Sequence, residues 1–456
     1  MRRAALLLAC AVVTVVSLGA VAATAAGSPW SPAASMMQPH QAATATLLLN
    51  GKVLVVGSFS QLNTGAELYD PAVDRWSPTG PMIVPRALGT ATLLPSGKVL
   101  IAGGIAADTG HSTTRTEIYD PAANSWSPEN GMAIPRSSHT ATLLLSGKVL
   151  VAGGQNASGY IATAELYDPR SDTWTMAAPM DAGYTSPQAT LLANGTVLIA
   201  GGATFGDGRG ELYDPVSDRW SNAGTAARNT QTATRLTDGR VFTTGQGKET
   251  HLYTPGTNHW SVGAAMLQDR DNPSATLLAD GRVLVAGGST TIGGQQVWLT
   301  SAEIYDPAGN RWSPAGCMAQ ARWEQTATLL STRVLIAGGA VPPAALSSAE
   351  LFDPGSEWAG RLIDFCPTAS AGQSPVDTPS PAASATVATP SAVPTGTVTR
   401  PSAGPVGELV RLTGIPGVGS LTISRLAAVG IVAAALVLLA LATALFLRAR
   451  SRRRGI

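Results

Sequence analysis

An eight-residue stretch that recurs along the chain constrains its fold more than any other feature. It reads GKVLVAGG at 147–154, and close copies stand at 51–57, 97–104, 195–202 and 281–288. A Tyr-Asp-Pro triplet or a near variant follows each glycine pair or its remnant, and a tryptophan comes six or seven residues after the aromatic residue of that triplet. Seven such sets stand 40–52 residues apart, and a period of this size indicates a propeller or a solenoid.

Each repeat predicts four short antiparallel strands, which we call A to D. TATLLL-type stretches predict strand A, and a Ser-Gly, Asn-Gly or Asp-Gly turn joins them to strand B, which contains the recurring stretch. AELYD-type stretches predict strand C, and a turn with proline after aspartate leads to strand D at the tryptophan. Four such strands repeated radially make the blades of a propeller, which leaves little sheet edge exposed.

The glycine pair, the Tyr-Asp-Pro triplet and the tryptophan at this spacing resemble the kelch repeat. The repeats also resemble the propeller of the galactose oxidase group, over about residues 30–358. The resemblance implies an all-β fold, a seven-bladed kelch-type β-propeller, but no particular activity, because one fold carries many functions. We expect the recurring glycines to let neighbouring backbones approach closely and the recurring tyrosines and tryptophans to fill the wedge between blades. Function is expected where the repeats differ.

Both ends of the chain indicate secretion and membrane anchoring. The N-terminus has two arginines, an apolar run and the small residues AATAAG at 22–27, which is typical of a signal peptide. At the other end, residues 426–447 contain no charge and are long enough for a helix to span a bilayer, and five arginines follow them. The positive charge after this helix predicts a cytoplasmic tail and places the preceding chain outside the cell.

The chain therefore divides into five predicted segments. They are a signal peptide at 1–25, a kelch-type β-propeller at 26–366, a stalk rich in Pro, Ser and Thr at 367–420, a single transmembrane helix at 426–447 and a basic cytoplasmic tail at 448–456. We expect a single-pass protein of the cell membrane with its propeller outside.

Eight tryptophans stand in register, although seven repeats need only seven D strands. Trp30 lies 46 residues before Trp76, and the last repeat is eroded around Trp358. We predict that the Trp30 segment supplies strand D of the last repeat and joins the two ends; if the Trp358 segment forms that strand instead, the Trp30 segment is surplus. Cys317 and Cys366 lie late in the repeat region, where a disulfide between them can persist outside the cell and hold the tail.

The charge of the secreted part argues against nucleic-acid binding. Seven of the 30 basic residues and none of the 29 acidic ones lie in the signal peptide and the tail, so the rest carries 23 basic against 29 acidic residues, a net charge of about −6. Nucleic-acid-binding domains have a basic surface instead. We therefore expect a protein or glycan ligand outside the cell as the partner.

The predicted strand directions place the B–C and D–A loops on one face of the propeller and the short A–B and C–D turns on the other. Loops of the first face are long and vary between repeats, as at 105–116 and 289–301. Aromatic residues outside the repeat motif map to these loops. They are candidates for ligand binding, with packing of the loops as the alternative: Phe59, Tyr160, Tyr184, Phe205, Trp298 and Trp323.

A second column of residues stands ten positions after each tryptophan, at the start of strand A on the same face. Four of its members are candidates for binding an acidic ligand group at the mouth of the central tunnel: Arg86, Arg136, Arg270 and Arg322. The other three members are His40, Tyr184 and Thr230. The alternative, which we favour because both columns recur, is a structural pair with the glutamate of strand C.

No enzyme site can be placed in the sequence. A copper-radical site like that of the galactose oxidase group needs two tyrosines, two histidines and a cysteine thioether, but six of the eight tyrosines belong to the repeat motif and the five histidines are scattered. No serine-hydrolase or nucleotide-binding motif is present. The sequence therefore predicts no catalytic residue, metal ligand or cofactor. It favours a module that binds a ligand with its long-loop face over the alternative, a galactose-oxidase-like or other propeller enzyme.

Overall fold

The computed structural model of the 456-residue chain describes residues 28–58, 65–202, 208–225, 230–356, 366–370, 409–412 and 421–424. The chain divides into two compact units, Met1–Pro381 and Ala382–Ile456. All the regular elements in the described residues are strands. Those of the second unit are one antiparallel pair, β38 (Leu409–Leu412) with β39 (Leu421–Ser424).

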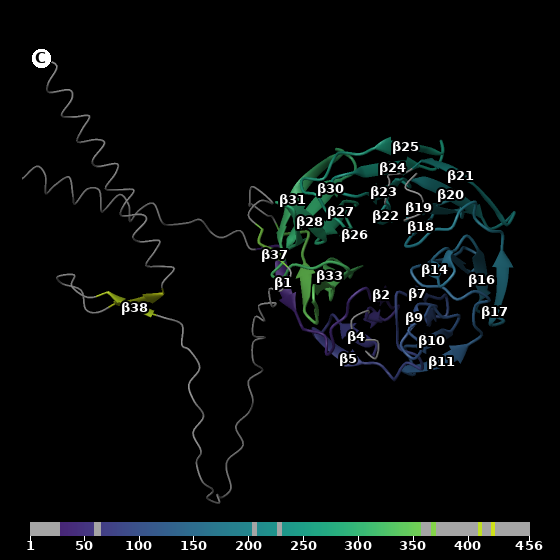
Figure 1. The fold of residues 1–456 in the computed structure, drawn as a ribbon, viewed down its shortest axis with the longest axis horizontal. Helices are drawn as coiled ribbons and strands as arrows, with labels where there is room; N and C mark the ends of the chain where they lie inside the picture. The colour runs from purple at the N-terminus through teal and green to yellow at the C-terminus, as the bar shows by residue number, and fades with distance from the viewer. Residues whose placement is uncertain are drawn as a thin grey trace, which may run out of the picture. The chain divides into compact units, whose positions relative to one another are not determined.

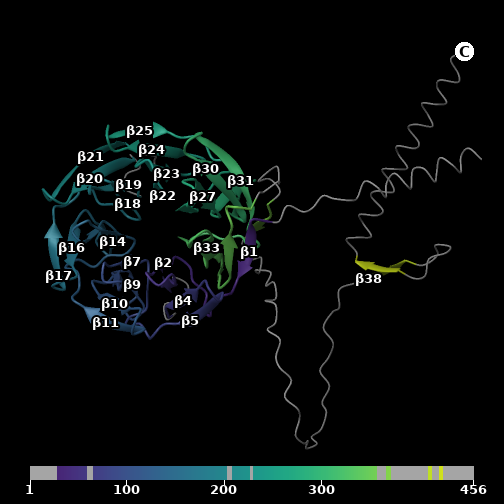
Figure 2. The ribbon, with the colours of Figure 1, turned by 180° about the vertical axis from the view of Figure 1, so that it is seen from behind.

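The described part of the first unit contains seven four-stranded antiparallel sheets set around a ring (Figure 1). Figure 2 shows the same ring from behind. Each sheet holds the four strands predicted for one repeat, in the order A, B, C, D. The all-β prediction is therefore confirmed.

The strands of the first four sheets, from A to D, are as follows: β2 (Thr44–Leu47), β3 (Val53–Val56), β4 (Glu67–Asp70) and β5 (Arg75–Pro78); β7 (Thr90–Leu93), β8 (Val99–Ala102), β10 (Thr116–Asp120) and β11 (Ser125–Glu129); β12 (Thr140–Leu143), β13 (Val149–Ala152), β16 (Ala164–Asp168) and β17 (Thr173–Ala177); β18 (Gln188–Leu191), β19 (Val197–Ala200), β20 (Arg209–Asp214) and β21 (Arg219–Thr225).

The strands of the last three sheets are β22 (Thr232–Arg235), β23 (Val241–Thr244), β24 (Thr250–Thr254) and β25 (His259–Val262); β26 (Ser274–Leu277), β27 (Val283–Ala286), β30 (Ser301–Asp306) and β31 (Arg311–Cys317); β32 (Thr326–Leu329), β33 (Val334–Ala337), β36 (Ala349–Phe352) and β1 (Trp30–Ala33). Shorter pairings join β6 (Arg86–Ala87) to β9 (Ile105–Ala106), β14 (Gln155–Asn156) to β15 (Gly159–Tyr160), β28 (Ser289–Ile292) to β29 (Gln295–Leu299), and β34 (Ala340–Val341) to β35 (Ala344–Ala345).

The ring closes both at its centre and at its rim. At the centre, the A strands of neighbouring repeats contact one another all the way round, and β32 contacts β2. At the rim, β1 pairs antiparallel with β36, with Trp30 opposite Phe352. The prediction that the Trp30 segment supplies strand D of the last repeat is confirmed, and Trp358 lies outside the described residues.

The glycine pair stands where neighbouring repeats touch through their backbones. Gly104 has a φ of +98°, and a Cβ atom placed on it would lie 2.6 Å from the carbonyl oxygen of Ala87. Its N–H donates to the carbonyl of Arg136 in the next repeat, with an N···O distance of 2.8 Å. Any side chain here would break this contact, which explains why glycine recurs at the position.

The core consists of wedges between adjacent sheets. Between the first and second repeats, Leu54 and Val56 of β3 pack against Val99 of β8 and against Tyr119. The Tyr119 ring is fully buried, and its centroid lies 4.9 Å from that of Trp126 across β10 and β11. The same tyrosine–tryptophan contact occurs in the first six repeats, so these residues fill the wedges as expected.

Two features fix the chain after the last repeat. Cys317, the last residue of β31, forms a disulfide with Cys366, which is the pairing expected from the sequence. β37 (Thr368–Ser370) then pairs with β29, although the sequence assigned these residues to the stalk. The ordered part of the first unit therefore continues past the predicted boundary at residue 366.

The described residues contain no helix that is long and apolar enough to cross a membrane. The predicted signal peptide at 1–25 and transmembrane helix at 426–447 lie outside the described residues, as does most of the predicted stalk. These segments stay predictions from the sequence.

Candidate functional site

One face of the ring carries the B–C and D–A loops, and we call it the long-loop face. Short strand pairs order these loops, namely β6 with β9, β14 with β15, β28 with β29 and β34 with β35. Isolated bridges, such as those of Ser137 with Gln155 and of Thr113 with Arg136, join D–A loops to B–C loops. The loops therefore form a second tier of structure over the ends of the sheets.

The arginines of the predicted column are buried and paired. Arg270 has no exposed surface, and its Nε and Nη2 each lie 2.9 Å from Oε1 of Glu303. Its Nη1 donates to the carbonyls of Gly287 and Ser301, at 2.9 and 2.8 Å. Burial lowers the pKa of Arg270, and the Glu303 carboxylate opposes this shift. The same ion pair joins Arg86 to Glu117, Arg136 to Glu165 and Arg322 to Glu350.

The glutamate of each pair also holds the D–A loop. Glu303 accepts the backbone N–H groups of Leu267 and Gln268, at 2.6 and 3.1 Å. Together with the guanidinium, these donors satisfy a carboxylate that is fully buried, as buried charges require. The four arginines are at most 2% exposed, so they are structural, which corrects their assignment to an acidic ligand.

Two repeats form the pair without arginine. In the first repeat, His40 Nε2 lies 3.2 Å from Oε1 of Glu67, and its Nδ1 lies 2.7 Å from the carbonyl oxygen of Gly57. In the fourth repeat, the Tyr184 hydroxyl donates to Oε1 of Glu211 at 2.9 Å. Because no cation faces Glu211, burial raises the pKa of this carboxyl group.

His139 lies beside this network, three residues after Arg136. It is 6% exposed, and its Nε2 is 3.1 Å from Oγ1 of Thr90 in the preceding repeat. Burial, and then the charge of Arg136, lowers the pKa of His139 to about 3. The imidazole is therefore neutral at pH 7 and has no access to a ligand.

Most of the described aromatic candidates are covered. Tyr184 and Trp298 are 3% and 4% exposed. Trp298 packs with the half-buried Trp323 and lies opposite Ala369 of β37. The remaining described candidate, Tyr160 in β15, is 53% exposed. Two further candidates, Phe59 and Phe205, lie outside the described residues. The prediction of exposed rings is therefore wrong for Tyr184 and Trp298, because loop packing covers them.

A polar groove lies on the long-loop face between the second and third repeats, with a volume of about 290 Å³, and we call it the loop groove. The B–C loop of the second repeat and both loops of the third repeat line it. Its lining contains no Asp, Glu, Lys or Arg: Ile105, Gly110, His111, Ser112, Pro135, Ser137, Gln155, Asn156, Ala157 and Ser158. A groove of this composition suits an uncharged polar ligand.

Hydrogen bonds between the loops fix the floor of the loop groove. Oγ of Ser112 lies 3.0 Å from Oγ of Ser137 and 3.1 Å from the carbonyl oxygen of Gln155. The amide of Asn156 donates to the carbonyl of Pro135 at 3.1 Å. These contacts use hydroxyl and amide groups from all three loops, so the floor is preorganised for binding.

Two side chains of the loop groove keep their polar atoms for a ligand. Neither the Gln155 amide nor the His111 imidazole has a hydrogen-bond partner among the described residues. Gln155 lies directly opposite Tyr160 in the β14–β15 pair, and directly opposed residues share one side of an antiparallel pair. Neither His111 nor Gln155 was a candidate from the sequence. The length of the loop at 105–116 was the signal that could have found them.

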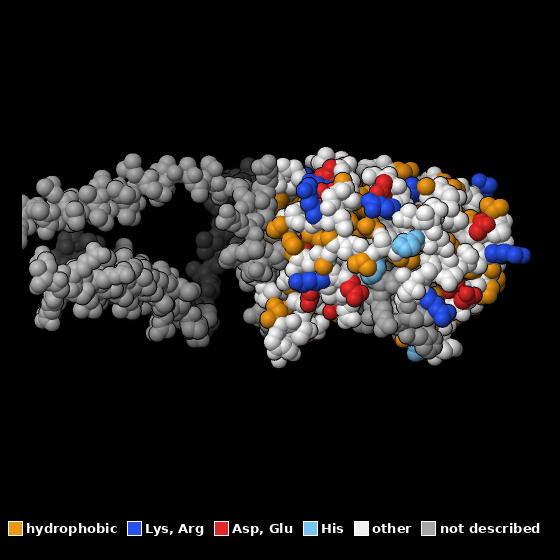
Figure 3. Space-filling model, turned by 90° about the horizontal axis from the view of Figure 1, so that it is seen from above, with side chains coloured by type: hydrophobic (Ala, Val, Ile, Leu, Met, Phe, Trp, Pro, Cys, Tyr) orange, Lys and Arg blue, Asp and Glu red, His pale blue; other side chains and the backbone are white. Residues whose placement is uncertain are grey.

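Charges elsewhere on the ring are mixed. The side of the ring seen in Figure 3 shows basic and acidic side chains interspersed, without a patch of one sign. Surface pairs such as Lys52 with Asp70 and Lys98 with Asp120, each at 3.0 Å, contribute to this pattern. Exposed pairs of this kind stabilise a protein by about 1 kcal/mol or less.

The described residues do not fit a copper-radical centre. Among them, no three His, Cys, Asp or Glu side chains gather as metal ligands. Cys317 and Cys366 are joined to each other, so neither sulfur is available for a thioether to tyrosine. Tyr184 is buried against Glu211. No mechanistic step through a metal can be built from this arrangement.

Comparisons with known proteins agree on the fold. The family model of the kelch motif matches residues 136–181 and 273–319. A solved structure described as a novel fungal alcohol oxidase of the AA5 family, in complex with copper, superposes with a TM-score of 0.58 and 21% sequence identity, over 71% of this chain and 76% of that one. No curated protein sequence matches the chain. At this identity the structural likeness concerns the fold alone.

Proposed function

The chain is a kelch-repeat propeller that resembles the galactose oxidase group, and we propose that it is a binding module whose ligand sits in the loop groove. We infer that its seven sheets are the seven blades of the propeller. The repeated residues are used in building these blades, since the arginine–glutamate pairs and the glycine pairs face inward. Binding is therefore assigned to a place where the repeats differ.

The free polar groups of the loop groove carry this proposal. The Gln155 amide offers both donors and an acceptor, and the exposed His111 imidazole adds a further donor or acceptor. Both stand over a floor fixed by Ser112 and Ser137. Tyr160 adds an exposed ring on the Gln155 side of β14–β15, and such rings combine apolar contact with a hydroxyl group.

The setting of this module follows from the sequence. We infer a propeller held outside the cell by a stalk and a single helix at 426–447, with a short cytoplasmic tail. Its partner is a protein or a glycan at the external face. The net negative charge of the external part disfavours nucleic acid.

A binding screen on the full chain tests the proposal. Glycan and protein arrays identify ligands of the wild type, and each ligand is then measured against Gln155→Ala and Tyr160→Ala. We expect each variant to weaken binding about tenfold, which corresponds to about 1.4 kcal/mol. Val216→Ser is the matched control, because Val216 is 94% exposed in the C–D turn of the fourth repeat, away from the groove. Ligands that bind both groove variants as tightly as the wild type would remove the groove as the site.

The second candidate function is a propeller oxidase. Its support is the structural likeness to a protein described as a copper-containing alcohol oxidase. Metal analysis and an absorption spectrum of the purified chain decide between the two functions. Stoichiometric copper with a radical absorption band would favour the oxidase, whereas a chain without either that still binds a ligand supports the binding module.

A further inference from the structure

We propose that the outer edge of β29 is a docking site for an extended peptide strand, that residues 366–370 fill this site in cis, and that the disulfide of Cys366 keeps it filled. We call residues 366–370 the strap. The site belongs to the sixth repeat, whereas the loop groove lies between the second and third, so it is independent of the function proposed above.

The strap completes a three-stranded sheet. β37 runs antiparallel to β29, with residues 370, 369 and 368 opposite Val297, Trp298 and Leu299. Oγ1 of Thr300 also donates to the carbonyl of Pro367 at 2.6 Å. In the described residues, the loop hairpins β14–β15 and β34–β35 have no third strand. Strand addition to a free edge is a recurrent mode of peptide recognition.

The strap covers a large aromatic side chain. Trp298 is 4% exposed, and it clusters with Ala321, Trp323 and Val341, against which Ala369 packs. The Trp298 indole N–H is buried and has no hydrogen-bond partner in the described part of the chain. Because the residue opposite this indole is small, the site fits an extended segment of small, uncharged residues such as the Pro-Thr-Ala-Ser of 367–370.

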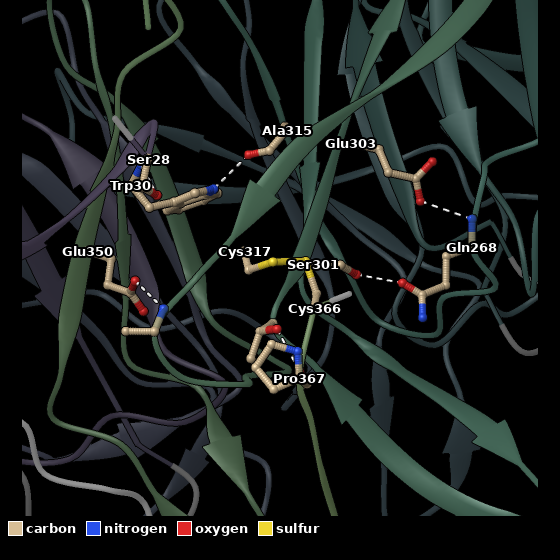
Figure 4. The surroundings of a disulfide bond; sticks show 12 residues. Ser28, Trp30, Gln268, Ser301, Glu303, Ala315, Cys317, Glu350, Cys366 and Pro367 are labelled. Atoms are coloured by element: carbon tan, nitrogen blue, oxygen red, sulfur yellow. Dashed lines mark hydrogen bonds between the residues drawn. A yellow bond between two sulfur atoms is a disulfide. The ribbon is translucent and has the colours of Figure 1, made fainter. Parts of the chain in front are cut away.

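The disulfide supplies the hold that so short a strand lacks. β37 has three residues, which is the lower limit of strand lengths in proteins, and its pairing alone is weak. Cys317 ends β31, a full member of the sixth sheet, so its bond to Cys366 fastens the strap to the ring (Figure 4). Both cysteines are partly exposed, which leaves the bond accessible to a small thiol reductant.

Reduction would open the site. A dithiol reductant breaks the Sγ–Sγ bond and supplies two electrons and two protons, so that two cysteine thiols form and the reductant leaves as its own disulfide. The strap is then held only by its strand pairing and the Thr300 hydroxyl. When it leaves, β29 presents unpaired N–H and C=O groups that another extended strand can pair with.

Hydrogen–deuterium exchange on the full chain tests this device. Exchange of residues 295–299 is compared in the oxidised chain and in the chain reduced by a dithiol, with mass spectrometry confirming both free thiols. We expect exchange in β29 to become at least about tenfold faster on reduction, while β3 in the core of the first sheet stays unchanged. Unchanged exchange in β29 of the fully reduced chain would overturn the proposal.

A variant and a peptide test the docking half. Cys366→Ser should show the fast exchange of β29 without any reductant. A synthetic peptide that copies residues 366–374, with serine at position 366, should restore slow exchange in this variant at millimolar concentration. The same peptide with Ala369→Trp should not, because a large residue clashes with Trp298. If the first peptide gives no protection, or both give the same protection, β29 is not a docking site.

Discussion

Six of the seven repeats bury a glutamate in strand C, and the residue that faces it decides how stable that carboxylate is. Arg270, Arg322 and their equivalents supply a full charge, whereas Tyr184 supplies only a hydroxyl group to Glu211. Removing one member of a buried ion pair leaves the other charge uncompensated, which is far more destabilising than losing a neutral hydrogen bond.

This difference predicts unequal effects of the same substitution. Glu303→Gln should destabilise the protein by about 3–5 kcal/mol, because Arg270 stays buried without a counter-charge. Glu211→Gln should cost only about 1–2 kcal/mol, because no cation faces it and burial already raises the pKa of this carboxyl group. Urea denaturation of both variants measures the difference. Equal losses would show that the arginine charge is not what the glutamate balances.

His139 predicts a pH dependence of stability. Its pKa falls from an ordinary 6.5 to about 3 on folding, mainly through burial, so the unfolded chain takes up a proton at a pH where the folded chain does not. Stability is therefore lost as the pH falls from 6.5 towards 3, by up to about 1.4 kcal/mol per pH unit from this group. His139→Gln removes this contribution. Denaturation at pH 7 and pH 5 should show a shallower loss in the variant, and equal slopes would contradict the assignment.

At the scale of the element, the glycine pair joins one sheet to the next. Gly104→Ala should destabilise the protein by about 3 kcal/mol or more, because φ is +98° and the added Cβ would lie 2.6 Å from the Ala87 carbonyl oxygen. Gly51→Ala is the control, since Gly51 also has a positive φ, +80°, but no atom lies within 4 Å of an added Cβ. It should cost about 1 kcal/mol. Denaturation midpoints check the contrast, and a Gly104→Ala loss no larger than that of the control would mean that the close approach is unimportant.

Strands A to D could be predicted from the sequence because each is coded by a local pattern that repeats. The elements of the long-loop face could not, because β9, β14 and β34 have two residues each and form through pairing rather than through a pattern. β37 was missed for a related reason: its Pro-Thr-Ala-Ser composition resembles that of the stalk, and its partner β29 is about 70 residues away. Trp298 was predicted exposed because nothing in the sequence indicated that β37 covers it.

The arginine column shows how far recurrence can guide the choice of site residues. Both the arginines and the glutamates recur, which favoured a structural pair, and the structure contains that pair. The residues left for binding are the ones that do not recur, such as His111 and Gln155. Their proximity depends on the packing of two loops from different repeats, so no single stretch of sequence contains it.

At the scale of the whole molecule, the account depends on a ring that is closed by the two ends of the repeat region. Trp30 contributes to this closure twice, since its ring lies 5.0 Å from that of Phe352 and its indole N–H donates to the Ala315 carbonyl at 2.8 Å. The Cys317–Cys366 disulfide lies close by and fastens the chain after the last repeat (Figure 4). Closure thus combines strand pairing, an aromatic contact and a covalent bond.

One cross-link tests this closure most directly. Ala33 and Ala349 lie directly opposite each other in β1 and β36, and opposed residues in an antiparallel pair are close enough for a disulfide. The double variant Ala33→Cys with Ala349→Cys should form an intramolecular disulfide in nearly every folded molecule, detected by peptide mass mapping, whereas Ala33→Cys with Ala157→Cys in the third repeat should not. If residues 33 and 349 cross-link no more than this control pair, the ring is not closed by β1.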